Sequence, residues 1–402
     1  MTSWARVGIA VAVLGILVGS PPVVFIGGAI VVIRLIAERW PRKVLDSLAY
    51  ERAVNPTKTV VGDEAELRIT LWNRSRLPVA WAVAHDTLSE RLRLNPPTTT
   101  LPSIAGPMRP FERITRRLKV VPTRRGVHEV GPVTFAVAEH FGTHLPRLES
   151  PLEPTTILAR PLMAPVVGSS PQAAPLAQVR ARQSLFTDPT LFAGVRPFQT
   201  GDPLRSVHWR ASARTASLQT KRYEPALSRQ QVLVFDVQTI EGPYWMLGYD
   251  EDLFEDLCVA ALSLARMLIM QDASCGFAAA GFSRTTQRYV FLPPRADRAQ
   301  IERIGDMLAR MTPESSAPFT QLLSWLPHRV ARGTALVILS GRSPESSAPV
   351  VRRLMQSGFP VHFLLFRDAE EHIAVARRAG LPAWPAAVDS DGGVPRAVSI
   401  DA

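Results

Sequence analysis

The sequence predicts a multi-domain protein: an N-terminal transmembrane helical hairpin, then a β-sandwich, then an α/β domain built on a mainly parallel sheet. Three observations support this prediction. Two apolar runs lie close together near the N-terminus, short runs of period-two alternation follow them, and buried-strand patterns alternate with helical patterns in the C-terminal part. A chain of 402 residues has room for two or three folded domains.

The hairpin is predicted over residues 1–40. Residues 7–18 and 23–37 are almost wholly apolar, and a Ser-Pro-Pro turn separates the two runs. A signal peptide and a buried core hairpin are the alternatives, but a second apolar run directly after the first disfavours a signal peptide. Because three basic residues follow the second run, we expect a two-pass protein of the cytoplasmic (inner) membrane with both termini in the cytoplasm. Anionic lipid is then an expected partner of the excess positive charge.

Residues 50–160 are predicted to form an immunoglobulin-like β-sandwich. Apolar and polar residues alternate over 65–71, 114–121 and 133–137, as they do in strands with one buried face. Short turn sequences rich in Gly, Pro, Asn and Asp separate these runs. Strands at this spacing are typical of small antiparallel sandwiches.

Residues 230–380 have the pattern of an α/β domain. The run 232–235 is continuously apolar and ends at Asp236, which is typical of a strand buried on both faces. Helical patterns over 252–271, 297–311, 350–356 and 370–379 alternate with further strands at 276–280, 288–292, 335–339 and 361–366. We interpret residues 161–229 as a linker followed by a basic segment, and residues 381–402 as an irregular tail.

The basic segment, residues 194–224, combines arginines with aromatic residues. Asp202 followed by Pro203 predicts a helix start, because the carboxylate can cap free N–H groups and proline fits the first turn. Residues 217–223 then have strand character. A structural brace and an exposed dock for an acidic partner are both open interpretations of the arginines.

This segment resembles the signature of the domain-of-unknown-function 58 family, on Gly194, Arg196, Gly201, Asp202, Arg205, His208, Trp209, Ser212, Ala213, Arg214 and Glu224. The resemblance implies a membrane-anchored protein that associates with MoxR-type AAA+ ATPases. If the arginines are an exposed dock, the partner-binding residues are Arg196, Asp202, Arg205, His208, Trp209, Arg210 and Arg214.

The C-terminal domain is similar to von Willebrand factor A-type domains, which are Rossmann-like, over about residues 230–379. Such domains often hold a divalent cation with an Asp-x-Ser-x-Ser sequence after the first strand. The matching positions here are Asp236, Gln238 and Ile240, and isoleucine cannot ligate a cation. Asp236 and Gln238 therefore form a degenerate site, which we expect to lack bound Mg²⁺, and we expect no other cofactor.

The chain shows no complete catalytic constellation. Its eight histidines are scattered, its two cysteines lie in apolar surroundings, and Ser283 lacks the second glycine of a nucleophile elbow. The formal net charge of +11 suits nucleic acid, lipid or acidic proteins, but we expect no nucleic acid beside a membrane anchor. We therefore predict a membrane-anchored, non-enzymatic adaptor or assembly factor that works with a MoxR-type AAA+ ATPase. The alternatives are a Mg²⁺-dependent von Willebrand factor A-type protein-binding module and an unrecognised hydrolase.

Overall fold

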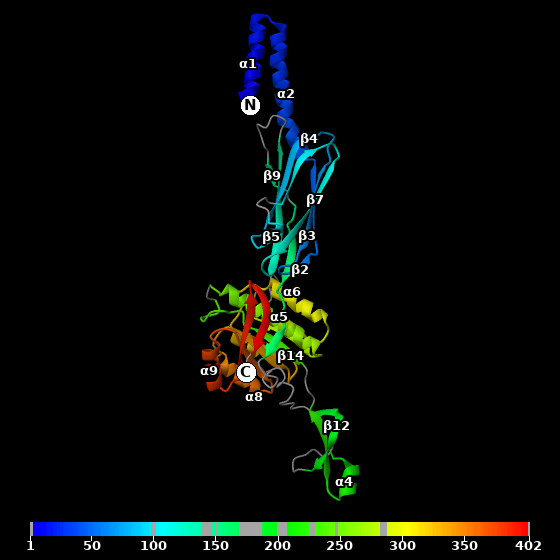
Figure 1. Cartoon of the computed structure of the whole chain (residues 1–402), viewed down its shortest axis with the longest axis vertical. Helices are drawn as coiled ribbons and strands as arrows, with labels where there is room; N and C mark the ends of the chain where they lie inside the picture. Colours follow the sequence, from blue (N-terminus) through cyan, green and yellow to red (C-terminus); the bar gives the residue numbers. More distant parts are fainter. Residues whose placement is uncertain are drawn as a thin grey trace. The chain divides into compact units, whose positions relative to one another are not determined.

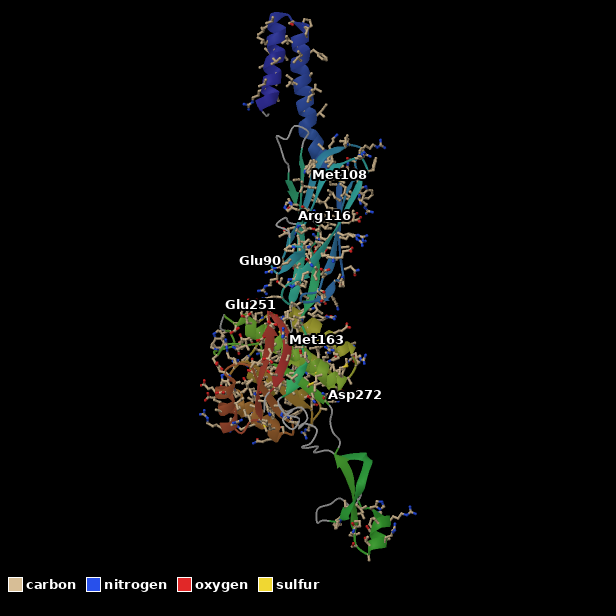
Figure 2. The ribbon with its side chains drawn as sticks, in the orientation of Figure 1. Glu90, Met108, Arg116, Met163, Glu251 and Asp272 are labelled. Carbon is tan, nitrogen blue, oxygen red and sulfur yellow. The ribbon has the colours of Figure 1, made fainter. Side chains whose placement is uncertain are left out.

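The computed structural model describes residues 3–97, 102–138, 147–149, 152–168, 187–198, 207–225, 230–245, 248–281 and 288–400. The chain forms two compact units, Met1–Arg160 and Pro161–Ala402. Figure 2 draws their side chains; Met108 is buried in the core of the first unit, and Asp272 is exposed on the second.

The first unit begins with two helices that lie side by side, α1 (Ser3–Val18) and α2 (Pro21–Leu45) (Figure 1). Gly19 follows α1 with a φ of 63°, in the left-handed region that glycine adopts without strain. The helices lie close together at a glycine: a Cβ added to Gly27 would lie 2.3 Å from the backbone nitrogen of Ala12.

The predicted transmembrane hairpin is not what the structure contains. In the described part of the chain, every helix falls short of the combined length and hydropathy that crossing a membrane requires. α1 has 16 residues, fewer than the roughly 20 that span a bilayer. The same finding overturns the predicted two-pass location in the cytoplasmic membrane with both termini in the cytoplasm.

Two β-sheets follow the helices in the first unit. Their strands are β1 (Leu48–Asn55), β2 (Lys58–Val60), β3 (Ala65–Asn73), β4 (Val79–Leu88), β5 (Leu92–Asn95), β6 (Ser103–Met108), β7 (Arg113–Pro122), β8 (Gly126–Ala138), β9 (Arg147–Glu149) and β10 (Thr155–Arg160). One sheet has the order β1-β3-β7-β5; the other has the order β2-β10-β8-β4-β6, with β9 beside β8. Both sheets contribute to one core, in which Leu67 and Ile69 of β3 join Ala84 of β4 and Phe135 of β8.

A buried polar contact connects these two sheets. The Tyr50 hydroxyl and the Arg52 guanidinium, both on β1, donate to the two carboxylate oxygens of Asp86 on β4. The side chains of Arg52 and Asp86 are fully buried. Burial raises the pKa of the Tyr50 hydroxyl above its ordinary value, and the negative charge of Asp86 raises it further. The pair therefore fixes how the sheets face each other inside an otherwise apolar core.

The second unit contains a larger sheet, a two-stranded sheet and several helices. Its elements are β11 (Val166–Gly168), β12 (Thr187–Pro197), α4 (Trp209–Thr215), β13 (Gln219–Pro225), β14 (Gln230–Phe235), α5 (Glu251–Met270), β15 (Ser274–Ala279), β16 (Val290–Arg295), α6 (Ala299–Arg310), α7 (Phe319–Trp325), the 3₁₀ helix η2 (Leu326–His328), β17 (Ala335–Ser340), α8 (Ala348–Gln356), β18 (Val361–Leu365), α9 (Ala369–Arg378), β19 (Ala383–Asp391) and β20 (Val394–Ile400). The larger sheet has the order β11-β20-β19-β18-β17-β14-β15-β16, and β12 pairs with β13.

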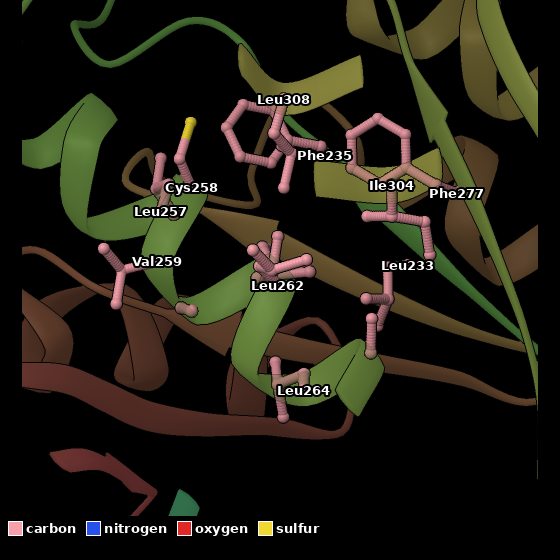
Figure 3. Close-up of a cluster of buried hydrophobic side chains, with 14 of the residues drawn as sticks. Leu233, Phe235, Leu257, Cys258, Val259, Leu262, Leu264, Phe277, Ile304 and Leu308 are labelled. Carbon is pink, nitrogen blue, oxygen red and sulfur yellow. The ribbon is translucent and has the colours of Figure 1, made fainter. Parts of the chain in front are cut away.

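Helices cover both faces of the larger sheet. On one face, α5 and α6 pack on Leu233, Phe235 and Phe277, and Figure 3 shows Leu257 and Leu262 of α5 in this cluster. The other face packs against α7, α8 and α9 through alternate strand residues such as Val232, Val234 and Ile338. Strands buried on both faces explain the continuous apolar runs in the sequence.

The predicted von Willebrand factor A-like fold is also corrected. The sheet is mixed. Its central strands run parallel to one another, namely β14, β15, β17, β18 and β19. In contrast, β16 is antiparallel to β15, and β20 is antiparallel to β19. Residues after Pro382, expected to be irregular, form the hairpin β19–β20, whose turn contains Gly392 and Gly393 at positive φ. The protein is mostly β-structure arranged in several sheets, without a clear Rossmann-like domain.

Candidate functional site

The strands β14 and β17 end at the same edge of the larger sheet, and their ends hold a group of polar residues. The two strands are parallel neighbours, with Phe235 opposite Leu339. β15 lies on the other side of β14, so the order of strands changes direction between β14 and β17. In open sheets of this kind, ligands bind outside the carboxyl ends of the strands at such a point. Asp236 and Ser340 are the first polar residues there.

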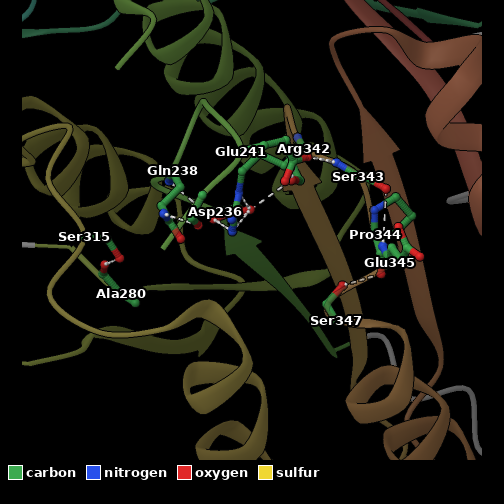
Figure 4. A network of polar contacts seen from close by, with 12 residues as sticks. Asp236, Gln238, Glu241, Ala280, Ser315, Arg342, Ser343, Pro344, Glu345 and Ser347 are labelled. Carbon is green, nitrogen blue, oxygen red and sulfur yellow. Dashed lines mark hydrogen bonds and ion pairs between the residues drawn. The ribbon is translucent and has the colours of Figure 1, made fainter. Parts of the chain in front are cut away.

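Asp236 is held by a dense set of hydrogen bonds (Figure 4). Arg342 donates from Nε to Oδ2 at 3.0 Å, and from Nη2 to Oδ2 at 2.9 Å and Oδ1 at 3.1 Å. Ser340 Oγ donates to Oδ2 at 2.9 Å, and the backbone N–H of Gln238 donates to Oδ1 at 3.3 Å. The Asp236 residue is only 3% exposed, so this is a buried ion pair whose carboxylate has several donors.

Burial and neighbouring groups act in opposite directions on Asp236. Burial raises the pKa of the carboxyl above its ordinary value, while the charge and hydrogen bonds of Arg342 and the hydroxyl of Ser340 work to lower it. Arginine keeps its charge under all ordinary conditions. Both oxygens of the Asp236 carboxylate therefore accept hydrogen bonds from Arg342.

The degenerate site at Asp236 and Gln238 does not fit Mg²⁺ as these residues are arranged. Magnesium needs several oxygen ligands around it, but both Asp236 oxygens already accept hydrogen bonds from Arg342. Ile240 offers no ligand, and no group of three acidic, histidine or cysteine side chains suited to a metal occurs within the described ranges. A guanidinium stands where a cation would have to bind.

Arg342 is the residue that sequence reasoning missed. Arg342 lies two residues beyond Ser340, the last residue of β17. Its backbone N–H donates to Ser340 Oγ at 3.1 Å, which turns the chain so that the side chain reaches Asp236. One signal in the sequence could have indicated this pair. It is a basic residue just after one strand, when the neighbouring strand ends in Asp.

The basic segment contains a short exposed helix, α4. It begins at Trp209, because Val207 bridges to Thr220 just before it and His208 caps the helix; the predicted helix start at Asp202 lies outside the described residues. The imidazole Nδ1 of His208 accepts a hydrogen bond from the backbone N–H of Ala211 at 3.1 Å. His208 therefore has a structural role at the helix start.

The other predicted partner-binding residues are placed only in part. Arg196 lies on β12, where its backbone is opposite Thr220 of β13. Asp202 and Arg205 lie outside the described residues. No residue of α4 is buried, and Trp209 is 66% exposed, with Arg210 and Arg214 exposed on the same helix. We define Trp209, Arg210 and Arg214 as the α4 surface.

Comparison with known proteins gives one family match. The family described as "Protein of unknown function DUF58" matches residues 194–354, which include the α4 surface and the Asp236–Arg342 pair. A curated relative, "Uncharacterized protein YeaD" of Bacillus subtilis (strain 168), is 24% identical over 251 residues. That alignment covers 59% of this chain and 57% of the relative, so the chain spans less than two thirds of the relative's length.

Solved structures resemble the chain only weakly. Escherichia coli alpha-2-macroglobulin, in its native conformation, matches 29% of this chain and 7% of its own chain at 18% identity, with a TM-score of 0.21. A conjugative transposon lipoprotein from Bacteroides eggerthii matches 26% of this chain and 94% of its own at 18% identity, with a TM-score of 0.16. Similarity at this level gives no information about fold or function.

Proposed function

We propose that this protein is a non-enzymatic adaptor that binds an acidic face of a partner protein through the α4 surface. The observation that supports this proposal is that α4 buries none of its residues while it presents Trp209 with Arg210 and Arg214. Trp209 belongs to no described core, and its exposed ring lies on the same short helix as two exposed arginines.

The chemistry of the α4 surface suits a protein interface. Tryptophan and arginine are the residues most often found at the energetically dominant positions of interfaces. An arginine guanidinium can bind a carboxylate with two parallel hydrogen bonds, so Arg210 and Arg214 favour a partner rich in Asp and Glu. The hairpin of β12 and β13 holds the segments on either side of the helix, and Ser212 Oγ accepts from the backbone N–H of Gln219 at 2.8 Å.

The residues best suited to acid–base chemistry are engaged in structural contacts. Asp236 is buried and paired with Arg342, and the Nδ1 atom of His208 caps α4. Binding is therefore the activity that these residues favour over bond breaking. By the resemblance to the domain-of-unknown-function 58 family, we propose a MoxR-type AAA+ ATPase as the partner.

Co-purification tests this proposal. The tagged full-length chain is expressed with a MoxR-type ATPase from the same genome, and the bound ATPase is quantified by mass spectrometry. The variants are Arg210→Glu with Arg214→Glu, and Trp209→Ala. The matched control is Arg352→Glu with Arg353→Glu, which reverses two exposed charges on α8.

We expect both α4 variants to lose most of the ATPase while the α8 control keeps it. Circular dichroism and thermal unfolding establish that each variant is folded. Undiminished ATPase on the folded α4 variants would remove α4 as the docking surface. Failure of the wild-type protein to retain any ATPase would reject the proposed partner.

A further inference from the structure

The turn between β6 and β7 in the first unit holds a large apolar side chain in an exposed position. Residues 109–112 form this turn, and Phe111 is 59% exposed with a φ of 60°. A bulky residue seldom adopts the left-handed region, because its side chain crowds the backbone there. The fold thus keeps a strained backbone and an exposed aromatic ring at one position, a combination that points to a binding role.

A buried side chain, Asn73 at the end of β3, holds this turn in place. Its Nδ2 donates to the carbonyl of Arg109 at 3.0 Å and to the carbonyl of Leu77 at 2.9 Å. Asn73 is fully buried, so both hydrogen bonds are shielded from water. The loops 74–78 and 109–112 are therefore held close together, and the exposed aromatic ring is a fixed feature of this end of the unit.

Both loops carry exposed arginines. Arg74, Arg76 and Arg109 are exposed, and among the described residues no carboxylate pairs with their side chains. The guanidinium of Arg74 lies over the ring of Trp72, with its central carbon 4.4 Å from the ring centroid. A cation on an aromatic face keeps its charge and its N–H donors available for an anion.

The end of α2 lies beside the same loops and adds to their positive charge. The backbone N–H of Arg74 donates to the carbonyl of Ser47 at 3.1 Å, and Lys43 is exposed in the last turn of α2. Of the acids on these segments, Asp46 and Glu112 are the counterweight within the described residues. The basic residues therefore outnumber the acidic ones here, and an anionic partner is favoured.

Two tryptophans lie near this end, one on each sheet. Trp72 is the residue before Asn73 on β3, and Trp81 lies near the start of β4 and is 48% exposed. Val79 of β4 is opposite Met108, the residue just before the turn, which Figure 2 labels. Tryptophan is enriched where a protein meets the boundary between water and lipid, because its ring is apolar and its N–H is polar.

Exposed apolar side chains continue from this end along α2. In the half of the helix nearest to the sheets they are Val32, Ile33, Leu35 and Ile36. A nucleic acid would satisfy the arginines but offers no hydrocarbon to cover Phe111 or these residues. The surface of an anionic bilayer offers both, since its phosphate groups lie directly above a hydrocarbon layer.

We infer that this end of the first unit binds the surface of an anionic lipid bilayer. Phe111 lies at the boundary between headgroups and hydrocarbon, and the arginines of both loops bind lipid phosphates, which accept two parallel hydrogen bonds from a guanidinium. The contact is with the bilayer surface and needs no helix that crosses it. It belongs to the first unit, whereas the α4 surface belongs to the second, so the inference goes beyond the proposed function.

Vesicle binding by the full-length chain tests the inference. The vesicles contain phosphatidylcholine alone or phosphatidylcholine with added phosphatidylglycerol. The readout is an environment-sensitive fluorophore on the cysteine introduced by Phe111→Cys, and labelling is selective because Cys258 and Cys275 are both buried. The control label is at Asp63→Cys, an exposed position in the turn before β3, at the opposite end of that strand from Trp72.

We expect the label at position 111 to shift to the blue on anionic vesicles and to be quenched by lipids that carry a quencher in the acyl chain. The label at position 63 should stay unchanged. Arg74→Gln with Arg76→Gln should weaken binding to anionic vesicles about twentyfold, since each arginine near an anionic surface contributes about fivefold. The matched control, Arg352→Gln with Arg353→Gln on α8, removes the same charge and should leave binding unchanged.

Phe111→Gly separates binding from folding. Glycine adopts a φ of 60° without strain, so the temperature of unfolding should stay the same or rise. Affinity for anionic vesicles should fall about tenfold, because the ring no longer leaves water. A purely structural role for Phe111 predicts the reverse, namely a lower unfolding temperature and an unchanged affinity.

Four results would overturn the inference. They are absence of binding to anionic vesicles by the folded protein, equal affinity for neutral and anionic vesicles, and an unshifted label at position 111 while the protein is bound. The fourth is an equal shift of that label with double-stranded DNA or polyglutamate, which would identify a site for polyanions in general. Because the assay contains no ATPase and leaves α4 unchanged, its failure is distinguishable from failure of the proposed function.

Discussion

Replacing Arg342 with methionine should destabilise the second unit by about 3–4 kcal/mol at pH 7.5, because it leaves Asp236 buried without its charged partner. Arg342 makes three contacts of 2.9–3.1 Å with the carboxylate, and the two side chains are 10% and 4% exposed. Removing one partner of a buried pair costs about 3–5 kcal/mol in general. Ser340 and the Gln238 N–H still donate to Asp236, so we place the cost in the lower part of that range.

The cost should fall as the pH is lowered. The pKa of Asp236 is already raised by burial, and Arg342 opposes that rise, so removing Arg342 raises the pKa further. A carboxyl whose pKa is raised in the folded state favours folding below the unfolded value of about 3.9 and loses that stability as the pH rises. In the variant Asp236 takes up a proton more readily, so we expect the difference from wild type to be smaller at pH 4.5 than at pH 7.5.

Native-state hydrogen exchange measures this effect on the full-length chain. Peptides from β14 and β17 report the opening free energy of the sheet, and peptides from β3 in the first unit are the internal reference. The double variant Asp236→Asn with Arg342→Met should recover more than half of the lost stability, since no charge remains buried. A cost below about 1 kcal/mol at pH 7.5, or one that does not depend on pH, would contradict the buried pair as described.

Three further predictions concern other parts of the chain. Gly27→Leu should force α1 and α2 apart, because even a Cβ at this position would lie 2.3 Å from a backbone nitrogen of α1. Faster hydrogen exchange in α1, with unchanged exchange in β3, would show this separation. Burial raises the pKa of the Cys275 thiol to about 12, so we expect no reaction with a disulfide reagent at pH 8 until denaturant is added; rapid labelling of the native protein would refute its burial. Burial lowers the pKa of His362 to about 4, so the folded protein loses stability as the pH falls below the unfolded value of about 6.5. His362→Leu removes this loss and should stabilise the protein by about 2 kcal/mol more at pH 5 than at pH 8. Urea unfolding at both pH values measures that difference, and an equal gain at the two would show that His362 protonates normally in the fold.

Part of the fold could be predicted because the pattern within a short stretch of sequence determines the local structure. The run at 232–235 is apolar throughout, which only a strand covered on both faces explains, and β14 is such a strand. The helical pattern at 252–271 likewise corresponds to α5. The β19–β20 hairpin was missed because its proline and glycine content indicates a loop, and only pairing with β18 and β11 makes these residues strands.

Only one residue of the candidate ion pair, Asp236, could be predicted from the local sequence. Asp236 could be identified because a carboxylate ended a buried strand, but its partner depends on which strand lies beside β14 and in which register. Arg342 is 106 residues away from Asp236, and no local pattern connects them. The cap of α4 at His208 was missed because histidine is not among the preferred N-cap residues, and the Val207–Thr220 bridge that precedes it depends on pairing outside the helix.

The short strand β11 has a consequence for synthesis on the ribosome. It lies at the beginning of the second unit, yet it pairs in parallel with β20, the last strand of the chain. Val398 and Ile400 of β20 are buried in the same core as α5. During synthesis α5 is therefore translated while one side of its core stays uncovered, until β20 has left the exit tunnel and can pair with β11.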